Sequence, residues 1–176
     1  MAPLIRAAAL VGAAAQLTTN SAVEPPTIAT SLGPVTGAVA RAHNGSVVHT
    51  FLGIPFAAPP IGEGRFAAPA AHPPWTQPRP ALQHGNCCPQ GGGRSGSEDC
   101  LVLDVYAPEG QKGGSRAIMV WLYGGGFQGG CISGYDGTTL AADTGNIVVA
   151  INCERCGWWW GHAERAHADP RAAQTA

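Results

Sequence analysis

The sequence has few charged residues and only one lysine, Lys112. Charged residues make up 12% of the 176 residues, against about 25% in ordinary globular domains. Ten basic residues nearly balance eleven acidic ones, which gives no electrostatic basis for binding nucleic acid or an anionic membrane surface. No apolar run reaches the roughly 18 residues that a membrane-spanning helix needs. The sequence therefore predicts one domain with no nucleic-acid partner, and it disfavours membrane association.

Long regular helices are disfavoured too, because helix-breaking residues are abundant. The chain has 25 glycines and 15 prolines, about twice the usual share, and eight of the prolines fall in residues 55–80. Hydrophobic residues still make up 45% of the chain, which is enough for a core. A loop-rich domain is expected, not a helix bundle or a coiled coil.

The N-terminus and the cysteines point to an oxidising compartment. Arg6 precedes an apolar, alanine-rich stretch, and small residues such as Ala22 follow, so residues 1–22 are interpreted as a signal peptide. An alanine-rich leader or an organelle transit peptide is the alternative. Asn44 begins an Asn-Gly-Ser glycosylation sequon. The chain has six cysteines, at positions 87, 88, 100, 131, 153 and 156. Together these features predict a protein of the secretory pathway or a secreted protein.

Short apolar or β-branched runs between turn residues predict the strands. These runs cover residues 33–40, 47–54, 101–106, 117–122 and 147–151. The Asn-Gly pair after the first run favours a hairpin. The last two runs are almost wholly apolar, which is typical of strands buried on both faces. Residues 138–144 between them fit one or two helical turns, so the sequence predicts a parallel strand-helix-strand unit of an α/β sheet.

The last 24 residues, 153–176, have a different character. They show neither a strand nor a helix period, and three of the five tryptophans stand together at residues 158–160. We interpret them as an unrelated, disordered tail, such as a shifted frame. Two cysteines and two histidines there are potential zinc ligands, but their spacing is too short for a zinc finger, so no metal site is predicted. The tryptophans could instead contact a membrane interface or a partner.

Three consecutive glycines, Gly124 to Gly126, follow the predicted strand at 117–122. Glycines let backbone amides turn inward without a Cβ clash. Two such amides can converge on one oxygen and form an oxyanion hole, which stabilises the charge of a tetrahedral acyl-transfer intermediate. A plain glycine-rich turn is the alternative. A phosphate-binding loop is disfavoured, because no Gly-Lys-Ser/Thr follows.

Ordered motifs between residues 30 and 152 carry a resemblance. They are Val35-Thr36-Gly37, Phe51 to Pro60 with Gly64-Arg65-Phe66, Trp75, Cys88-Pro89-Gln90, Ser97 to Pro108, Trp121 to Phe127, and Val148 to Asn152. In these segments the chain resembles the type-B carboxylesterase and cholinesterase family of α/β-hydrolases. The resemblance implies the N-terminal part of an α/β-hydrolase fold over residues 23–152. That part comprises a small β-hairpin and the first strands of a central mixed sheet, and it stops before the nucleophile elbow.

The resemblance also implies roles for individual residues. Gly125 and Gly126 match the positions whose amides form the oxyanion hole. Cys88 and Cys100 match a family disulfide, whereas Cys87, Cys131, Cys153 and Cys156 have no assigned partner and are expected to be free or mispaired. Arg65 and Glu98 match a structural ion pair. No cofactor is implied, and the partner of the full-length parent would be a small carboxylic ester.

The chain departs from the family pattern at the catalytic residues. The nucleophile needs a Gly-x-Ser-x-Gly frame, and residues 93–97 fail at its last position. His162 and His167 lie in the tail and match nothing in the family. The serine, acid and histidine of the triad are therefore missing, and we expect this chain to be an inactive fragment. The loop between Cys88 and Cys100 lacks an aromatic residue, which argues against choline esters and for a general carboxylesterase parent.

Three interpretations fit the sequence. The chain is the N-terminal part of a secreted serine carboxylesterase, a non-catalytic adhesion or binding module of cholinesterase-like fold, or a short product with no folded activity. In the family the strand at 117–122 pairs with the nucleophile's strand, which this chain lacks. We therefore expect an exposed apolar edge there, through which the isolated chain self-associates and becomes poorly soluble.

Overall fold

The computed structural model describes residues 24–65, 67–90, 95–110, 115–126 and 129–153. The predicted leader at 1–22 and the tail from residue 154 lie outside these ranges. The strands are β1 (Thr27–Ala29), β2 (Pro34–Thr36), β3 (Ala38–Arg41), β4 (Val47–Pro55), β5 (Arg79–Pro80), β6 (Val102–Pro108), β7 (Ile118–Trp121) and β8 (Ile147–Ile151). The helices are α1 (Thr138–Thr144) and two 3-10 turns, η1 (Gly62–Gly64) and η2 (Ile132–Gly134).

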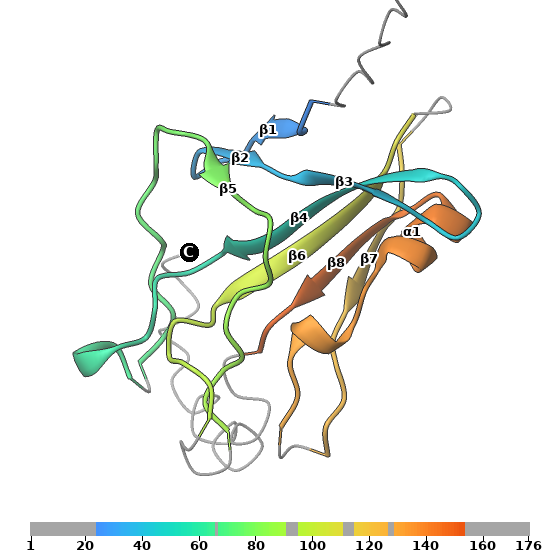
Figure 1. The fold of residues 1–176 in the computed structure, drawn as a ribbon. Coiled ribbons are helices and arrows are strands. Elements are labelled where there is room, and N and C mark those ends of the chain that lie inside the picture. Colours follow the sequence, from blue (N-terminus) through green and yellow to red (C-terminus); the bar gives the residue numbers. More distant parts are fainter. Residues whose placement is uncertain (1–23, 66, 91–94, 111–114, 127–128, 154–176) are drawn as a thin grey trace, which may run out of the picture.

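The strands form a five-stranded mixed sheet and a small three-stranded sheet (Figure 1). The large sheet has the order β3-β4-β6-β8-β7, and the small one has the order β1-β2-β5. Neighbours in the large sheet are antiparallel except β7 and β8, which are parallel and joined through α1. The predicted strand-helix-strand unit is therefore confirmed.

Gly37 divides the predicted strand at residues 33–40 into two strands that belong to different sheets. Its amide donates a hydrogen bond to the Pro26 carbonyl at 2.8 Å, which takes it out of the hairpin ladder. A Cβ at this position would lie 2.3 Å from the Thr50 carbonyl oxygen. The close approach of the chain to β4 therefore requires glycine, and the predicted hairpin is formed by β3 and β4 alone.

A bulge interrupts β4 where the sequence reads Phe-Leu-Gly-Ile-Pro. The pairing of β4 with β6 shifts register between Phe51 and Ile54, and Gly53 has a φ of 71°, which favours glycine. The freed Gly53 amide donates a 2.7 Å hydrogen bond to Oδ1 of Asp104. Asp104 is fully buried, and its Oδ2 lies 2.6 Å from Nδ1 of His84. This carboxylate therefore fills the gap that the bulge opens.

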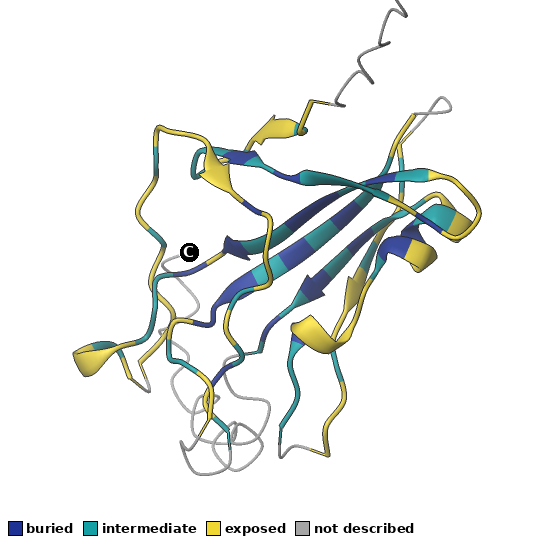
Figure 2. Cartoon of the chain, in the orientation of Figure 1, coloured by how far each residue is buried: buried dark blue, intermediate teal, exposed yellow. Residues whose placement is uncertain are grey.

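Hydrophobic clusters hold the sheets and α1 together. Val48, Tyr106, Ala141 and Val148 form the cluster beneath α1. A second cluster joins the two sheets and consists of Val35, Phe51, Ile54 and Ala81, with Trp75 packed against it. Figure 2 shows buried residues along β4, β6 and β8, alternating with less buried ones. Burial, with the nearby Asp104 and Asp136 carboxylates, raises the pKa of the Tyr106 phenol above its ordinary value.

Strand β7 lies at the edge of the sheet and is mostly exposed. Ile118 and Val120 are 63% and 58% exposed, and Leu122 just beyond the strand is 69% exposed. Burial on both faces, which the apolar composition alone indicates, is therefore wrong for this run, whereas the exposed apolar edge expected from the family resemblance is observed. Strand β8 alternates between buried and half-buried positions. The cause is topological, because α1 contacts β4, β6 and β8, and no described strand pairs with the outer edge of β7.

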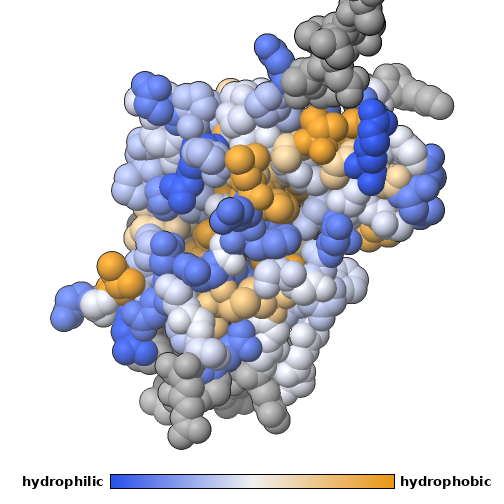
Figure 3. All heavy atoms as spheres, viewed as in Figure 1, coloured by the Kyte–Doolittle hydropathy of each residue, from blue (hydrophilic) through white to orange (hydrophobic). Residues whose placement is uncertain are grey.

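We expect the isolated chain to self-associate through β7, since an apolar strand with unpaired backbone groups is a template for pairing. Changing Val120 to lysine places a charge on this edge and should shift the sedimentation profile toward monomer. The matched control is Leu82→Lys, because Leu82 is 52% exposed but lies outside β7. Figure 3 shows further hydrophobic surface in the upper middle of the viewed face. If Leu82→Lys dissociated the assemblies to the same extent as Val120→Lys, nonspecific hydrophobic association, and not pairing at the β7 edge, would be the cause.

Candidate functional site

The three glycines after β7 form an exposed loop with unused amide donors. Gly126 has a φ of 59°, which disfavours a side chain. A Cβ on Gly125 would lie only 1.5 Å from the Gly129 carbonyl oxygen. Within the described ranges, the amides of Gly125 and Gly126 have no hydrogen-bond acceptor. Gly125 and Gly126 are adjacent, and both positions disfavour a side chain. Their two free N–H groups can donate to an oxygen outside the loop.

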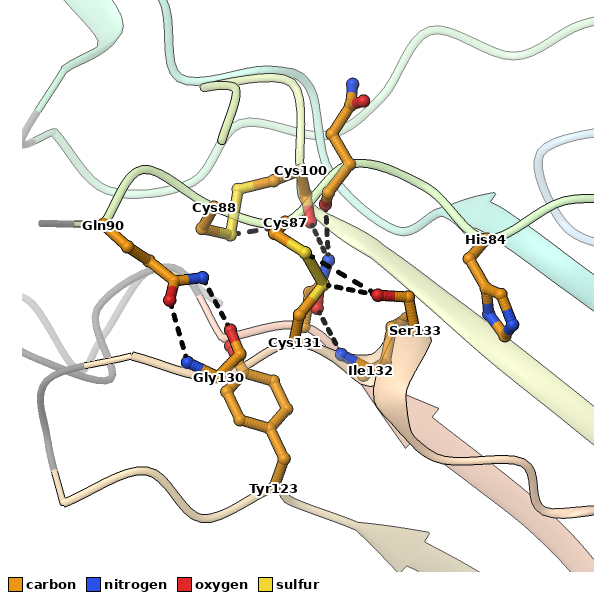
Figure 4. Close-up of a disulfide and its surroundings, with 12 residues drawn as sticks. His84, Cys87, Cys88, Gln90, Cys100, Tyr123, Gly130, Cys131, Ile132 and Ser133 are labelled. Atoms are coloured by element: carbon orange, nitrogen blue, oxygen red, sulfur yellow. Dashed lines mark hydrogen bonds between the residues drawn. A yellow bond between two sulfur atoms is a disulfide. The ribbon is translucent and has the colours of Figure 1, made fainter. Parts of the chain in front are cut away.

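The far end of this loop is held by Gln90, which bonds the backbone of Gly130 on both sides (Figure 4). Its Nε2 donates to the Gly130 carbonyl at 2.8 Å, and its Oε1 accepts from the Gly130 amide at 3.0 Å. A Cβ on Gly129 would come within 2.4 Å of the same Oε1. The Gln90 amide thus pairs with the loop as a neighbouring strand would. Sequence reasoning found Gln90 within a motif but assigned it no role.

Two disulfides close the region behind the loop. Cys88 and Cys100, the pair that the family resemblance implies, are joined with a Cα–Cα distance of 5.0 Å. Cys87 and Cys131 form a second bridge with a Cα–Cα distance of 5.2 Å. The expectation that Cys87 and Cys131 are free or mispaired is therefore wrong, and none of the described cysteines is free. The second bridge joins residues 44 positions apart, so the fold was needed to find it.

Asn152 ties the end of β8 to three of these segments. Its side-chain Nδ2 donates to the carbonyls of Asn86 at 2.8 Å and Cys100 at 3.1 Å. Its Oδ1 accepts from the Ile132 amide at 3.2 Å, and the residue is only 1% exposed. A buried amide with all these partners fixes the loops that surround the glycines. The sequence marked Asn152 only as the end of a motif.

The other predicted site residues lie apart from the glycine loop. Arg65 Nε lies 2.5 Å from Glu98 Oε1, and both side chains are partly exposed; such a pair contributes at most about 1 kcal/mol to stability. Asn44 is exposed in the turn between β3 and β4, and its Nδ2 donates to Oδ1 of Asp143 at 3.1 Å. The structure thus leaves the sequon at the surface and the ion pair in the scaffold.

The structure offers no complete nucleophilic centre within the described residues. An open cavity of about 860 Å³ beside the second disulfide has Ser95, Ser97 and Ser133 in its lining, and no histidine is among its described lining residues. The described part of the chain also contains no group of three or more side chains placed to hold a metal ion. Among the helices within the described ranges, none has the length and apolar character to cross a bilayer. Of the features considered for ester chemistry in the described residues, the free glycine amides are the ones that could stabilise an oxyanion.

Comparison with known proteins places these features in context. Residues 24–159 match the model of the Carboxylesterase family. Carboxylesterase 3 of Homo sapiens is 39% identical over 150 residues, covering 76% of this chain and 26% of that protein. Acetylcholinesterase of Electrophorus electricus is 38% identical and covers 72% and 23%. The solved structure of a thermophilic PNB esterase superposes with a TM-score of 0.64 at 36% identity, covering 72% of this chain and 27% of that one. The chain thus spans about a quarter of the length of these relatives.

Proposed function

Because the chain belongs to the carboxylesterase family, we propose that it supplies the oxyanion hole of a carboxylic-ester hydrolase. The observation that carries the proposal is the pair of free amides at Gly125 and Gly126. Donors aimed at the developing oxyanion act chiefly on the transition state, which is how they accelerate acyl transfer. The test is a chimera in which residues 24–152 replace the matching segment of the thermophilic esterase, so that ester hydrolysis depends on this chain's loop.

On its own, the chain is proposed to be inactive. It contains no Gly-x-Ser-x-Gly, and the serines that line the cavity have no histidine beside them in that lining. An oxyanion hole without a nucleophile and a base accounts for only a small part of a serine hydrolase's rate.

We expect the purified chain to release p-nitrophenol from p-nitrophenyl acetate no faster than buffer, and Gly125→Pro to leave this rate unchanged. The rate is followed by absorbance, with heat-unfolded chain as the control for reaction at surface side chains. Turnover above that control which Gly125→Pro abolishes would contradict the proposed inactivity.

For the parent enzyme we propose general carboxylic esters as substrates. The loop between Cys88 and Cys100 has no aromatic residue, and an aromatic face is what attracts a quaternary ammonium group. This composition supports uncharged esters over choline esters.

We propose a secretory location for the protein. Two disulfides among the described residues fit an oxidising compartment. The exposed position of Asn44 fits a glycosylation acceptor, because a glycan needs surface access.

A further inference from the structure

The Cys87–Cys131 disulfide lies in the wall of the open cavity of about 860 Å³. Ser95, Gly130 and Ser133 line the same cavity. None of the described lining residues carries a carboxylate, so the described part of the wall does not repel an incoming thiolate. We propose that this disulfide is a site of thiol–disulfide exchange for small dithiols that enter the cavity.

The two disulfides differ in access although Cys87 and Cys88 are neighbours in the chain. Cys88 and Cys100 are 6% and 2% exposed and pack in a cluster with Ala57 and Leu101. Cys87 and Cys131 are only half-buried, and Figure 4 shows their disulfide beside Ser133. Exchange requires a thiolate to reach a disulfide sulfur. A small dithiol therefore meets Cys87–Cys131 first.

Ser133 gives the exchange a direction. Its hydroxyl donates to Sγ of Cys131 at 3.3 Å, and its oxygen lies 3.7 Å from Sγ of Cys87. A hydrogen bond to the departing sulfur stabilises it as a thiolate, and a better leaving group leaves faster. The attacking thiolate thus bonds to Cys87 Sγ while Cys131 leaves.

The step balances with a dithiol as the reductant. The first thiolate forms a mixed disulfide with Cys87 and releases the Cys131 thiolate, which takes up a proton. The second sulfur of the dithiol then attacks the first, closes a cyclic disulfide and releases Cys87 as a thiol. The protein gains two electrons and two protons, and the dithiol loses both.

Reduction of Cys87–Cys131 removes one of the tethers on the backbone at Gly130 and Cys131, which follows the glycine loop. Cys131 directly follows Gly130 and precedes η2, so two hydrogen bonds from Gln90 would then hold Gly130 to the segment at 87–90. This consequence for Gly125 and Gly126 rests on the proposed function, whereas the exchange itself does not. We infer that the redox state of Cys87–Cys131 sets the rigidity of the glycine loop.

The test treats the full chain with limiting dithiothreitol, then alkylates free thiols with iodoacetamide and maps them by peptide mass spectrometry. We expect Cys87 and Cys131 to be alkylated at least about ten times faster than Cys88 and Cys100, and this difference to vanish in urea. Equal rates for the two pairs without urea, or faster opening of Cys88–Cys100, would overturn the proposal. No ester is present, so the result is independent of the hydrolase proposal.

A matched pair of variants tests the role of Ser133. Ser133→Ala should slow the opening of Cys87–Cys131 about threefold and leave Cys88–Cys100 unchanged. Ser95→Ala, which alters the same cavity without a contact to either sulfur, should slow neither. If Cys87–Cys131 opened at equal rates in the two variants, Ser133 would have no role in the exchange.

The link to the glycine loop has its own test. Amide hydrogen exchange across residues 124–130 should be faster after selective reduction of Cys87–Cys131, and unchanged exchange would overturn the inferred link to the loop.

Discussion

Replacing Gly126 with valine should lower kcat for a p-nitrophenyl ester by about 10²- to 10³-fold in the chimera with the thermophilic esterase. The φ of 59° at Gly126 is strongly unfavourable for a β-branched residue, so the amide must turn away from its position. KM should change little, because the lost hydrogen bond forms in the transition state. Steady-state kinetics of the chimera and its variant measure both constants.

Gly124 provides the matched control in the same loop. A Cβ on Gly124 meets no heavy atom within 4 Å, so Gly124→Ala should keep kcat within about twofold of the chimera. Thermal melting of each variant separates a local effect from loss of fold. A folded Gly126→Val variant with unchanged kcat would contradict the oxyanion proposal and indicate that the three glycines only form a turn.

Replacing Asp104 with alanine should lower the free energy of unfolding by about 3 kcal/mol, since it leaves the buried donor at Gly53 without a partner and removes the partner of His84. Asp104→Asn should cost less, about 1 kcal/mol, because its side-chain oxygen can still accept from the Gly53 amide. Urea unfolding of the chimera measures the three free energies.

The control for Asp104 is another aspartate that bonds a neighbouring side chain at the surface. Asp143 accepts a hydrogen bond from Asn44, and its side chain is 48% exposed. Asp143→Ala should change the unfolding free energy by no more than about 0.5 kcal/mol. If Asp104→Ala cost no more than this, the bulge in β4 would be held by its backbone pairing and not by the carboxylate.

Structural features that depend on residues close together in the chain could be predicted from the sequence alone. The helix at 138–144 has the predicted bounds, and the prediction needed only the length of the segment between two apolar runs. Asp136 accepts from the Thr138 amide at 2.8 Å, and Gly145 ends the helix with a φ of 69°. The order of the motifs likewise led to the correct family and fold class.

Features that depend on distant partners were not predictable in this way. Gln90 meets Gly130 across 40 positions, and Asn152 bonds Cys100 across 52; no periodicity encodes such pairs. The apolar run around β7 predicted burial, but burial is decided by what packs against a strand. At β7 the crossover through α1 places β8 inside the sheet and leaves β7 at its edge.

The position of β7 at the sheet edge, just before the glycine loop, links what covers this edge to the surroundings of the loop. Only Leu122 and Tyr123 separate the strand from Gly124, so a parallel strand added to its free edge would end close to the glycine loop. Such a strand would also exclude water from the two free amides, and donors act more strongly where water is excluded. Under the proposed function, the free energy gained by covering the edge would thereby be coupled to the strength of the oxyanion hole. A partner that binds β7 weakly would form a correspondingly weak site.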